Sequence, residues 1–129
     1  MKLKVITPDV TLFEGNIKSI NIAERGGSFT ILKGHAPLIV VVRDPVSTIQ
    51  TETDELTYIA AKFGTLKVLD NEVSLIVDYG VDGTSKEDAR TNLENLRNEI
   101  IQNSDNLGDD TIANLEIELL KRMQKLGRH

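Results

Sequence analysis

The chain has 129 residues, no cysteine and a net charge of −5, with 40% hydrophobic and 27% charged residues. This length suits one medium domain or a small domain with an appendage, and the composition is that of a globular chain. The missing cysteines exclude disulfides, thiolate metal sites and a thiol nucleophile, and the acidic charge argues against nucleic-acid binding because phosphate would repel it.

The first part of the chain, residues 1–83, is predicted to form an all-β sandwich of about ten short strands. Apolar and polar residues alternate in several runs, for example at Leu3 and Val5, so one face of each run would be buried. Other runs are rich in β-branched residues, and turn signals about every 6–12 residues are typical of a sandwich or barrel. The runs are residues 2–6, 17–22, 29–31, 38–42, 46–51, 55–60, 65–68 and 73–77.

Residues 38–42, with the sequence LIVVV, form the longest fully apolar run. An apolar run without alternation is typical of a strand covered on both faces, so this strand is predicted to be the most buried one. The run is far shorter than the roughly 20 residues of a membrane-spanning helix, and no direct membrane insertion is expected.

After Gly83 the apolar period lengthens to three or four residues, which predicts a helical hairpin over residues 84–129. Thr84 and Glu87 match the S/T-x-x-E capping box of a helix start. Apolar residues then share one face of each helix. They are Ala89, Leu93, Leu96 and Ile100 in the first helix, and Ile112, Leu115, Leu119, Met123 and Leu126 in the second. Isolated helices of about 17 residues are marginal in water, so the hairpin is expected to be the less stable part and able to detach.

The end of the second predicted helix carries a basic cluster, made of Lys121, Arg122, Lys125 and Arg128. One interpretation is a solvated helix end that complements the helix dipole. The other is a docking face for an acidic partner, favoured by opposite charge. Both interpretations fit the pattern.

The stretch GGSFTILKGHAPLIV, residues 26–40, invites a chemical interpretation. It is not a P-loop, because that motif places Gly-Lys-Ser/Thr at the start of a helix, whereas Lys33 here precedes Gly34 and a strand follows. His35 could be a general base, but no nucleophile or orienting group is marked for it, so a turn or interface role is favoured. The second histidine is the last residue, and the acidic runs fit a helix start and a hairpin tip. No catalytic residue and no metal site is therefore predicted.

The most specific segment runs from Gly27 to Leu38, where a glycine and a short apolar strand precede Gly-His-Ala-Pro-Leu. The segments TLFEG at residues 11–15, TLKV at residues 65–68 and NEVSLI at residues 71–76 add to it. With the plan of a β-domain followed by a helical hairpin, these segments resemble the epsilon subunits of F-type ATP synthases over nearly the whole chain.

The resemblance implies a ten-stranded sandwich, residues 1–83, that binds the gamma subunit and the c-ring, and a regulatory two-helix domain, residues 84–129. It implies a non-catalytic rotor subunit of the central stalk that couples ion translocation to ATP synthesis at the alpha and beta subunits. The expected location is peripheral, on the cytoplasmic face of a bacterial plasma membrane. The hairpin is expected to fold onto the sandwich, or to extend along gamma and inhibit ATP hydrolysis.

The family also implies contact residues. Those expected to face gamma or the c-ring are Gly27, Ser28, Gly34, His35, Ala36 and Pro37, and the basic cluster is expected to meet the alpha and beta subunits. Some members bind ATP through Ile/Leu-Asp-x-x-Arg-Ala, but the matching stretch here keeps only Arg90, with Glu87 as a longer acid. This departure argues against ATP as a regulatory ligand, and no other cofactor is implied. The chain also has Ala61-Lys62-Phe63-Gly64 at a place where a Gly-Gly pair is common in the family.

Two other functions compete with the rotor subunit. The chain could be a stand-alone β-sandwich that binds a ligand and dimerises through its hairpin, in which case dimers would form without gamma. It could also be an enzyme that uses His35, in which case replacing His35 would abolish its function.

Overall fold

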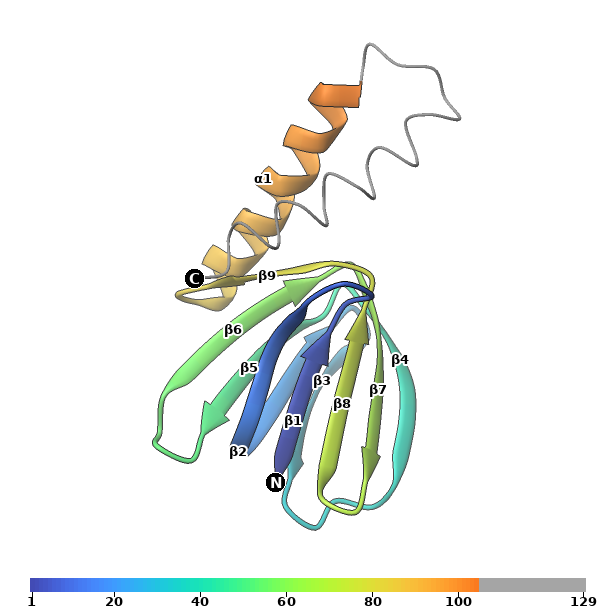
Figure 1. Cartoon of the computed structure of the whole chain (residues 1–129), viewed down its shortest axis with the longest axis vertical. Helices are drawn as coiled ribbons and strands as arrows, with labels where there is room; N and C mark the ends of the chain where they lie inside the picture. Colours follow the sequence, from blue (N-terminus) through green and yellow to red (C-terminus); the bar gives the residue numbers. More distant parts are fainter. Residues whose placement is uncertain (105–129) are drawn as a thin grey trace.

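Nine strands and one helix make up residues 1–104, the part of the chain that the computed structural model describes (Figure 1). They are β1 (Lys2–Ile6), β2 (Thr11–Glu24), β3 (Gly27–Leu32), β4 (Leu38–Arg43), β5 (Val46–Thr51), β6 (Leu56–Ala61), β7 (Phe63–Leu69), β8 (Glu72–Val77), β9 (Gly80–Gly83) and α1 (Lys86–Ser104). Hydrogen bonding links the strands in the order β4-β7-β8-β1-β2-β5-β6-β9, and β3 pairs with β2. The predicted β-sandwich is confirmed. The second predicted helix lies outside the described residues.

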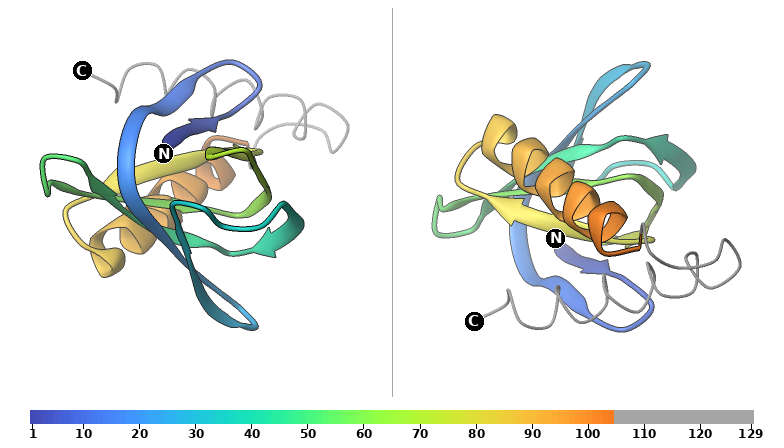
Figure 2. Two further views of the ribbon diagram at one scale, coloured as in Figure 1. Left: turned by 90° about the horizontal axis from the view of Figure 1, so that it is seen from below. Right: turned by 90° about the horizontal axis from the view of Figure 1, so that it is seen from above.

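β2 belongs to both layers of the sandwich. Its first half pairs antiparallel with β1, from Lys2 opposite Asn16 to Ile6 opposite Thr11. After a register shift between Ile17 and Ser19, its second half pairs with β3 and β5. The strong curve that carries β2 from one layer to the other is visible in Figure 2. Because β2 counts once in each layer, nine strands fill the ten places of the predicted sandwich.

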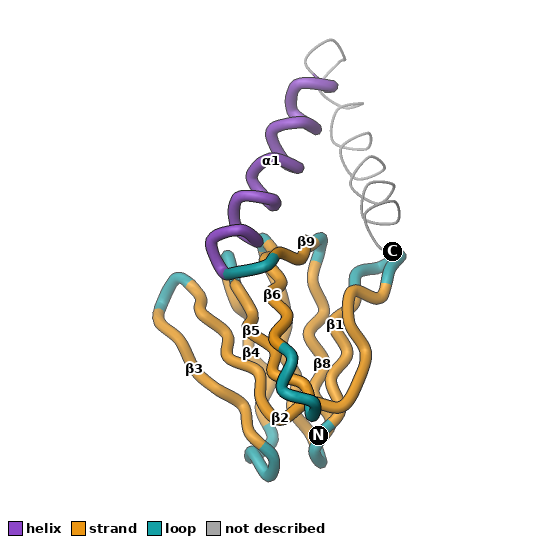
Figure 3. The backbone as a smooth tube through the Cα atoms, turned by 90° about the vertical axis from the view of Figure 1, so that its left-hand side faces the viewer, coloured by secondary structure: helices purple, strands orange, loops and turns teal. Residues whose placement is uncertain are grey.

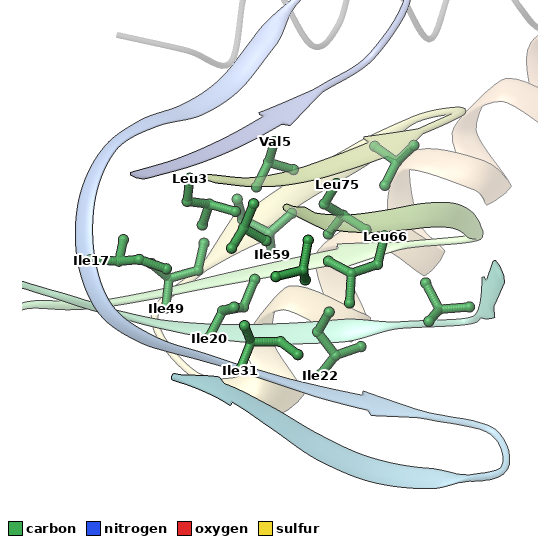
Figure 4. Close-up of a cluster of buried hydrophobic side chains, with 14 of the residues drawn as sticks. Leu3, Val5, Ile17, Ile20, Ile22, Ile31, Ile49, Ile59, Leu66 and Leu75 are labelled. Carbon is green, nitrogen blue, oxygen red and sulfur yellow. The ribbon is translucent and has the colours of Figure 1, made fainter. Parts of the chain in front are cut away.

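The core is built from alternate residues of the strands, the ones that face inward, as the period-two pattern predicts (Figure 4). Full burial of one such aliphatic side chain contributes about 1.5–3 kcal/mol, so this cluster is the main source of stability. Its buried members are Leu3, Val5, Ile17, Ile20, Ile22, Ile31, Val42, Ile49, Ile59, Ala61, Leu66, Val68, Val73, Leu75 and Val77.

The prediction that residues 38–42 form the most buried strand is wrong. β4 lies at the end of its layer and pairs only with β7 among the described strands. Val42 is fully buried, but Ile39 is 71% exposed and Val41 is 64% exposed. One face of the apolar run enters the core, and the other face is left uncovered within residues 1–104.

The residue that caps α1 is Ser85, one residue later than the predicted Thr84. The Ser85 hydroxyl accepts a hydrogen bond from the Asp88 amide at 3.0 Å, and the Asp88 carboxylate accepts one from the Thr84 amide at 2.8 Å. Ser85 therefore caps the helix, in a variant of the box in which Asp88 accepts from the residue before the cap, and Glu87 takes no part in it. The sequence motif fits Thr84 and Glu87, whereas the structure uses Ser85 with the shorter acid Asp88.

α1 packs on the layer end formed by β5, β6 and β9, and is joined to it by the short loop after β9 (Figure 3). Ala89 is fully buried against Val46 and Ala60, and Leu96 packs with Tyr79. The predicted stripe of Ala89, Leu93 and Leu96 is thus confirmed, and the Ile100 side chain lies outside the described residues. No helix in residues 1–104 is long and apolar enough to cross a membrane.

Candidate partner-binding surfaces

An apolar surface lies on the outward face of β4, β7 and β8, and is called here the outer apolar face. Its members are Ile39, 71% exposed, Val41, 64%, Ile76, 50%, and Phe63, 49%. Val41 lies opposite Thr65 and Thr65 lies opposite Ile76, so these residues form one row across three strands, with Thr65 between the two apolar side chains. Contiguous exposed apolar side chains of this kind mark interaction sites.

Sequence reasoning missed the outer apolar face. The signal is present in β8, where Ile76 falls between the buried Leu75 and Val77 and so occupies the face that normally carries polar residues. Phe63 gives the same signal in β7, next to the buried Gly64.

The loop of Gly34, His35, Ala36 and Pro37 is exposed at the end of the sandwich where β3 leads into β4. Gly34 has a φ of 84°, which a glycine adopts without strain. Its amide donates to the Asn71 side chain at 2.8 Å, so the β7–β8 hairpin supports the loop. The His35 ring Nδ1 lies 2.7 Å from the Ala36 carbonyl oxygen. His35 is thus an ordered and exposed turn residue.

Gly27 and Ser28 are exposed at the opposite end of the sandwich, in the β2–β3 hairpin. They are the first two residues of β3, and the rest of that strand separates them from Gly34, a distance of about 20 Å at the usual rise of a strand. The structure therefore does not bring the two groups of predicted contact residues together. It also separates Ser28 and Asp44, near the hairpin end, from His35, so these three residues form no catalytic triad.

An ion cluster ties the β2–β3 hairpin to the β4–β5 turn. Asp44 pairs with Arg25 at 2.5 Å and with Lys62 at 3.3 Å. Burial acts to raise the pKa of Asp44, but the hydrogen bonds and charges of Arg25 and Lys62 outweigh it and hold the pKa below its ordinary value. Glu24 adds a second link, because its carboxylate accepts from the Gly26 and Arg43 amides.

A pocket of about 350 Å³ lies between α1 and the ends of β5 and β6. Its charged lining residues are Asp44, Lys62, Arg90, Glu94 and Arg97. The Arg97 guanidinium donates to the Tyr79 hydroxyl at 2.8 Å.

Arg90 lines the pocket but Glu87 does not, so the two residues left from the ATP motif do not meet there. Within residues 1–104, no three His, Asp or Glu side chains gather as metal ligands. The basic cluster of residues 121–128 lies outside the described residues.

The sequence matches a known family and curated relatives. The family profile "ATP synthase, Delta/Epsilon chain, beta-sandwich domain" matches residues 1–83. Proteins named ATP synthase epsilon chain from a Nitratiruptor species and from Wolinella succinogenes are 26% and 25% identical over 108 residues. Each alignment covers 82% of this chain, with 84% of the first relative and 82% of the second.

Two solved structures share the fold. A chain of the Euglena gracilis mitochondrial ATP synthase has a TM-score of 0.58 at 16% identity, covering 98% of this chain and 80% of that one. A chain from the central stalk and c-ring of the Tetrahymena thermophila mitochondrial ATP synthase has a TM-score of 0.53 at 14% identity. That match covers 62% of this chain and 64% of the other, just under two thirds of its length. At these identities the likeness shows the fold alone.

Proposed function

Since the chain belongs to the ATP synthase delta/epsilon chain family, as an epsilon subunit, we propose that it is a non-catalytic rotor subunit of the central stalk. In this role it turns with the gamma subunit and the c-ring and couples ion translocation to ATP synthesis at the alpha and beta subunits. Residues 1–83 form the binding domain and residues 84–129 the regulatory domain. The subunit is held at the cytoplasmic face of a bacterial plasma membrane through its partners.

The outer apolar face is the observation that carries this proposal. Four large apolar side chains, each about half exposed or more, stand together on one side of the sandwich. Burying them against a partner would contribute about 3–6 kcal/mol, taking half of the usual value for each side chain. We assign this face to the gamma subunit, because a rotor subunit needs a lasting and largely apolar contact.

The two exposed loop groups support contacts with two partners. Because Gly27–Ser28 and Gly34–Pro37 lie at opposite ends of β3, one flat contact does not cover both. We assign the Gly34–Pro37 loop to gamma, since β4 continues from it directly into the outer apolar face. The β2–β3 hairpin is then left for the c-ring.

Co-elution with a gamma subunit from the same source tests the binding role. The wild-type chain is expected to co-elute with gamma, and Ile76→Glu is expected to weaken the complex at least 10-fold because it places a charge in an apolar contact. Leu56→Glu is the matched control, since Leu56 is 54% exposed but lies on β6, away from this face. A wild-type chain that does not bind gamma contradicts the function. Equal weakening by both variants contradicts the assignment of the face.

The regulatory role concerns residues 84–129. A small stripe of Ala89, Leu93 and Leu96 holds α1 on the sandwich, and a short helix held this way can exchange between a docked and a released state. In the released state the hairpin extends along gamma and inhibits ATP hydrolysis, with Lys121, Arg122, Lys125 and Arg128 against acidic groups of the alpha and beta subunits.

Truncation after Gly83 tests the regulatory role. The truncated chain should still assemble with gamma, and the ATPase activity of the assembled complex should rise because the inhibitory element is gone. Unchanged ATPase activity in a fully assembled complex would show that the hairpin does not inhibit this enzyme.

A further inference from the structure

Two residues of β4, Ile39 and Val41, direct their backbone N–H and C=O groups toward an open edge of the sheet. The Arg43 amide donates to the Glu24 carboxylate at 3.3 Å, and the Arg43 carbonyl oxygen accepts from the Arg25 amide at 3.2 Å. Both groups of Arg43 therefore point away from β7. In an antiparallel pair, backbone direction alternates from residue to residue.

The register between β4 and β7 is unbroken from Leu38 opposite Val68 to Arg43 opposite Phe63. Ile39 and Val41 must therefore point their N–H and C=O groups the same way as Arg43 does.

These two residues combine an unpaired backbone with exposed apolar side chains. Among the described residues, the β2–β3 hairpin forms hydrogen bonds with this edge of β4 only at the Arg43 backbone. No described residue pairs with the amides and carbonyls of Ile39 and Val41. Their side chains are the two most exposed members of the outer apolar face. Edge strands are usually protected by proline or charge. Here that protection stands only at the two ends, at Pro37 and Arg43.

We propose that an extended segment of a partner protein adds to this edge as a further strand beside β4. The inference rests on the proposed function, in that the partner is the gamma subunit. The segment would form hydrogen bonds with both backbone groups of Ile39 and of Val41, and its own apolar side chains, at alternate positions, would extend the outer apolar face. Strand addition of this kind takes its affinity from the main chain and its specificity from alternate side chains.

The charges at this edge favour a different chain over a second copy of this one. Arg43 follows Val41 on the outward face, and Lys67 lies opposite Ile39 in β7, on the side of β4 away from the open edge. Neither cation forms an ion pair within residues 1–104. A second copy would add its own Arg43 to the same edge, whereas a segment with an acidic side chain near Arg43 would complement this charge.

Amide hydrogen exchange measured residue by residue tests the inference. In the free full-length chain, the amides of Ile39 and Val41 should exchange rapidly, while those of Val40 and Val42, which pair with β7, should be protected. In the complex with gamma, Ile39 and Val41 should become at least 10-fold slower. If both are already protected in the dilute free chain, the edge is not open and the inference is wrong. Protection that grows with the concentration of the chain alone would show that a second copy is the occupant, which also contradicts it.

Two variants of Val41 separate strand addition from simple burial. Val41→Pro removes an amide that points to the open edge, so the ladder with β7 keeps its hydrogen bonds. It should weaken binding to gamma at least 10-fold, with Val40 and Val42 still protected as evidence of folding. Val41→Thr keeps the amide and the branched shape, and should weaken binding much less.

The two levels of the proposal fail differently. A stable complex with gamma in which Ile39 and Val41 exchange as fast as in the free chain overturns the strand addition and leaves the proposed function standing. A chain that forms no complex with gamma overturns both.

Discussion

Replacement of Gly83 by alanine should release α1 from the sandwich. A Cβ atom at Gly83 would lie 2.4 Å from the Ala89 nitrogen, 2.7 Å from the Ala89 Cα and 2.9 Å from the Asp88 carbonyl carbon. All three are backbone atoms, so no change of side-chain rotamer relieves the overlap. Gly83 is itself held in β9, opposite Tyr58 of β6. The helix must therefore move, by about 1 Å if ordinary van der Waals contact is to be restored.

The size of the effect follows from what this movement disturbs. Ala89 is fully buried and packs against Val46 and Ala60, so a movement of α1 disturbs this packing. Forcing an extra methyl group into such packing costs about 1–3 kcal/mol. This cost destabilises the docked state of α1 and leaves the sandwich core unchanged. It should therefore shift the docking equilibrium about 5- to 150-fold toward release.

Hydrogen exchange of the α1 amides measures the shift. Exchange over residues 89–96 should become about 5- to 150-fold faster in Gly83→Ala, while the core strands β1 and β8 keep their protection. Gly15→Ala is the matched control, because its Cβ would meet only the Phe13 ring at an ordinary 3.6 Å. Unchanged α1 exchange in Gly83→Ala would refute the reasoning. Under the proposed function, the variant should also lower the ATPase activity of the assembled complex, whereas truncation raises it.

Three further predictions concern single contacts. Ser85→Ala should lower the stability of α1 by about 1 kcal/mol, since the Ser85 hydroxyl caps the Asp88 amide, and the α1 amides should exchange faster as a result. Glu87→Ala removes a side chain that makes no capping bond, so it should have little effect on the exchange of the α1 amides. Ile31→Ala should lower the free energy of unfolding in urea by about 2–5 kcal/mol because Ile31 is fully buried; a loss below about 1 kcal/mol would contradict its place in the core. Asp44→Asn keeps a residue that tolerates the φ of 48°, and should cost at most about 1 kcal/mol at pH 7 because its ion pairs are partly exposed. The pKa of Asp44 is lowered in the folded state, so its contribution is present above the ordinary value of 3.8 and is lost as the pH falls through the lowered pKa; a difference between wild type and variant that persists in stronger acid would contradict this.

The sequence determined which residues face the core. Strict alternation placed Leu3, Val5, Leu75 and their counterparts inside, and the structure confirms these faces. The change of period after Gly83 likewise predicted the helix that follows it. Both features depend on the repeat of the chain itself, two residues in a strand and about 3.6 in a helix, so no knowledge of distant neighbours was required.

The tertiary structure decided what covers each element. The run at residues 38–42 fits a central strand as well as an edge strand, and only the strand order, with β4 last, left Ile39 and Val41 exposed. The capping box could start at Thr84 or at Ser85, and the structure adopts the register that docks Ala89 against Gly83.

The stretch from Gly27 to Pro37 reads as one motif, yet β3 carries its two ends to opposite ends of the sandwich. In each case the local pattern fixes which side of an element is apolar. The number of neighbours that meet that side depends on contacts between residues far apart in the chain, and these exist only once the strands have found their order.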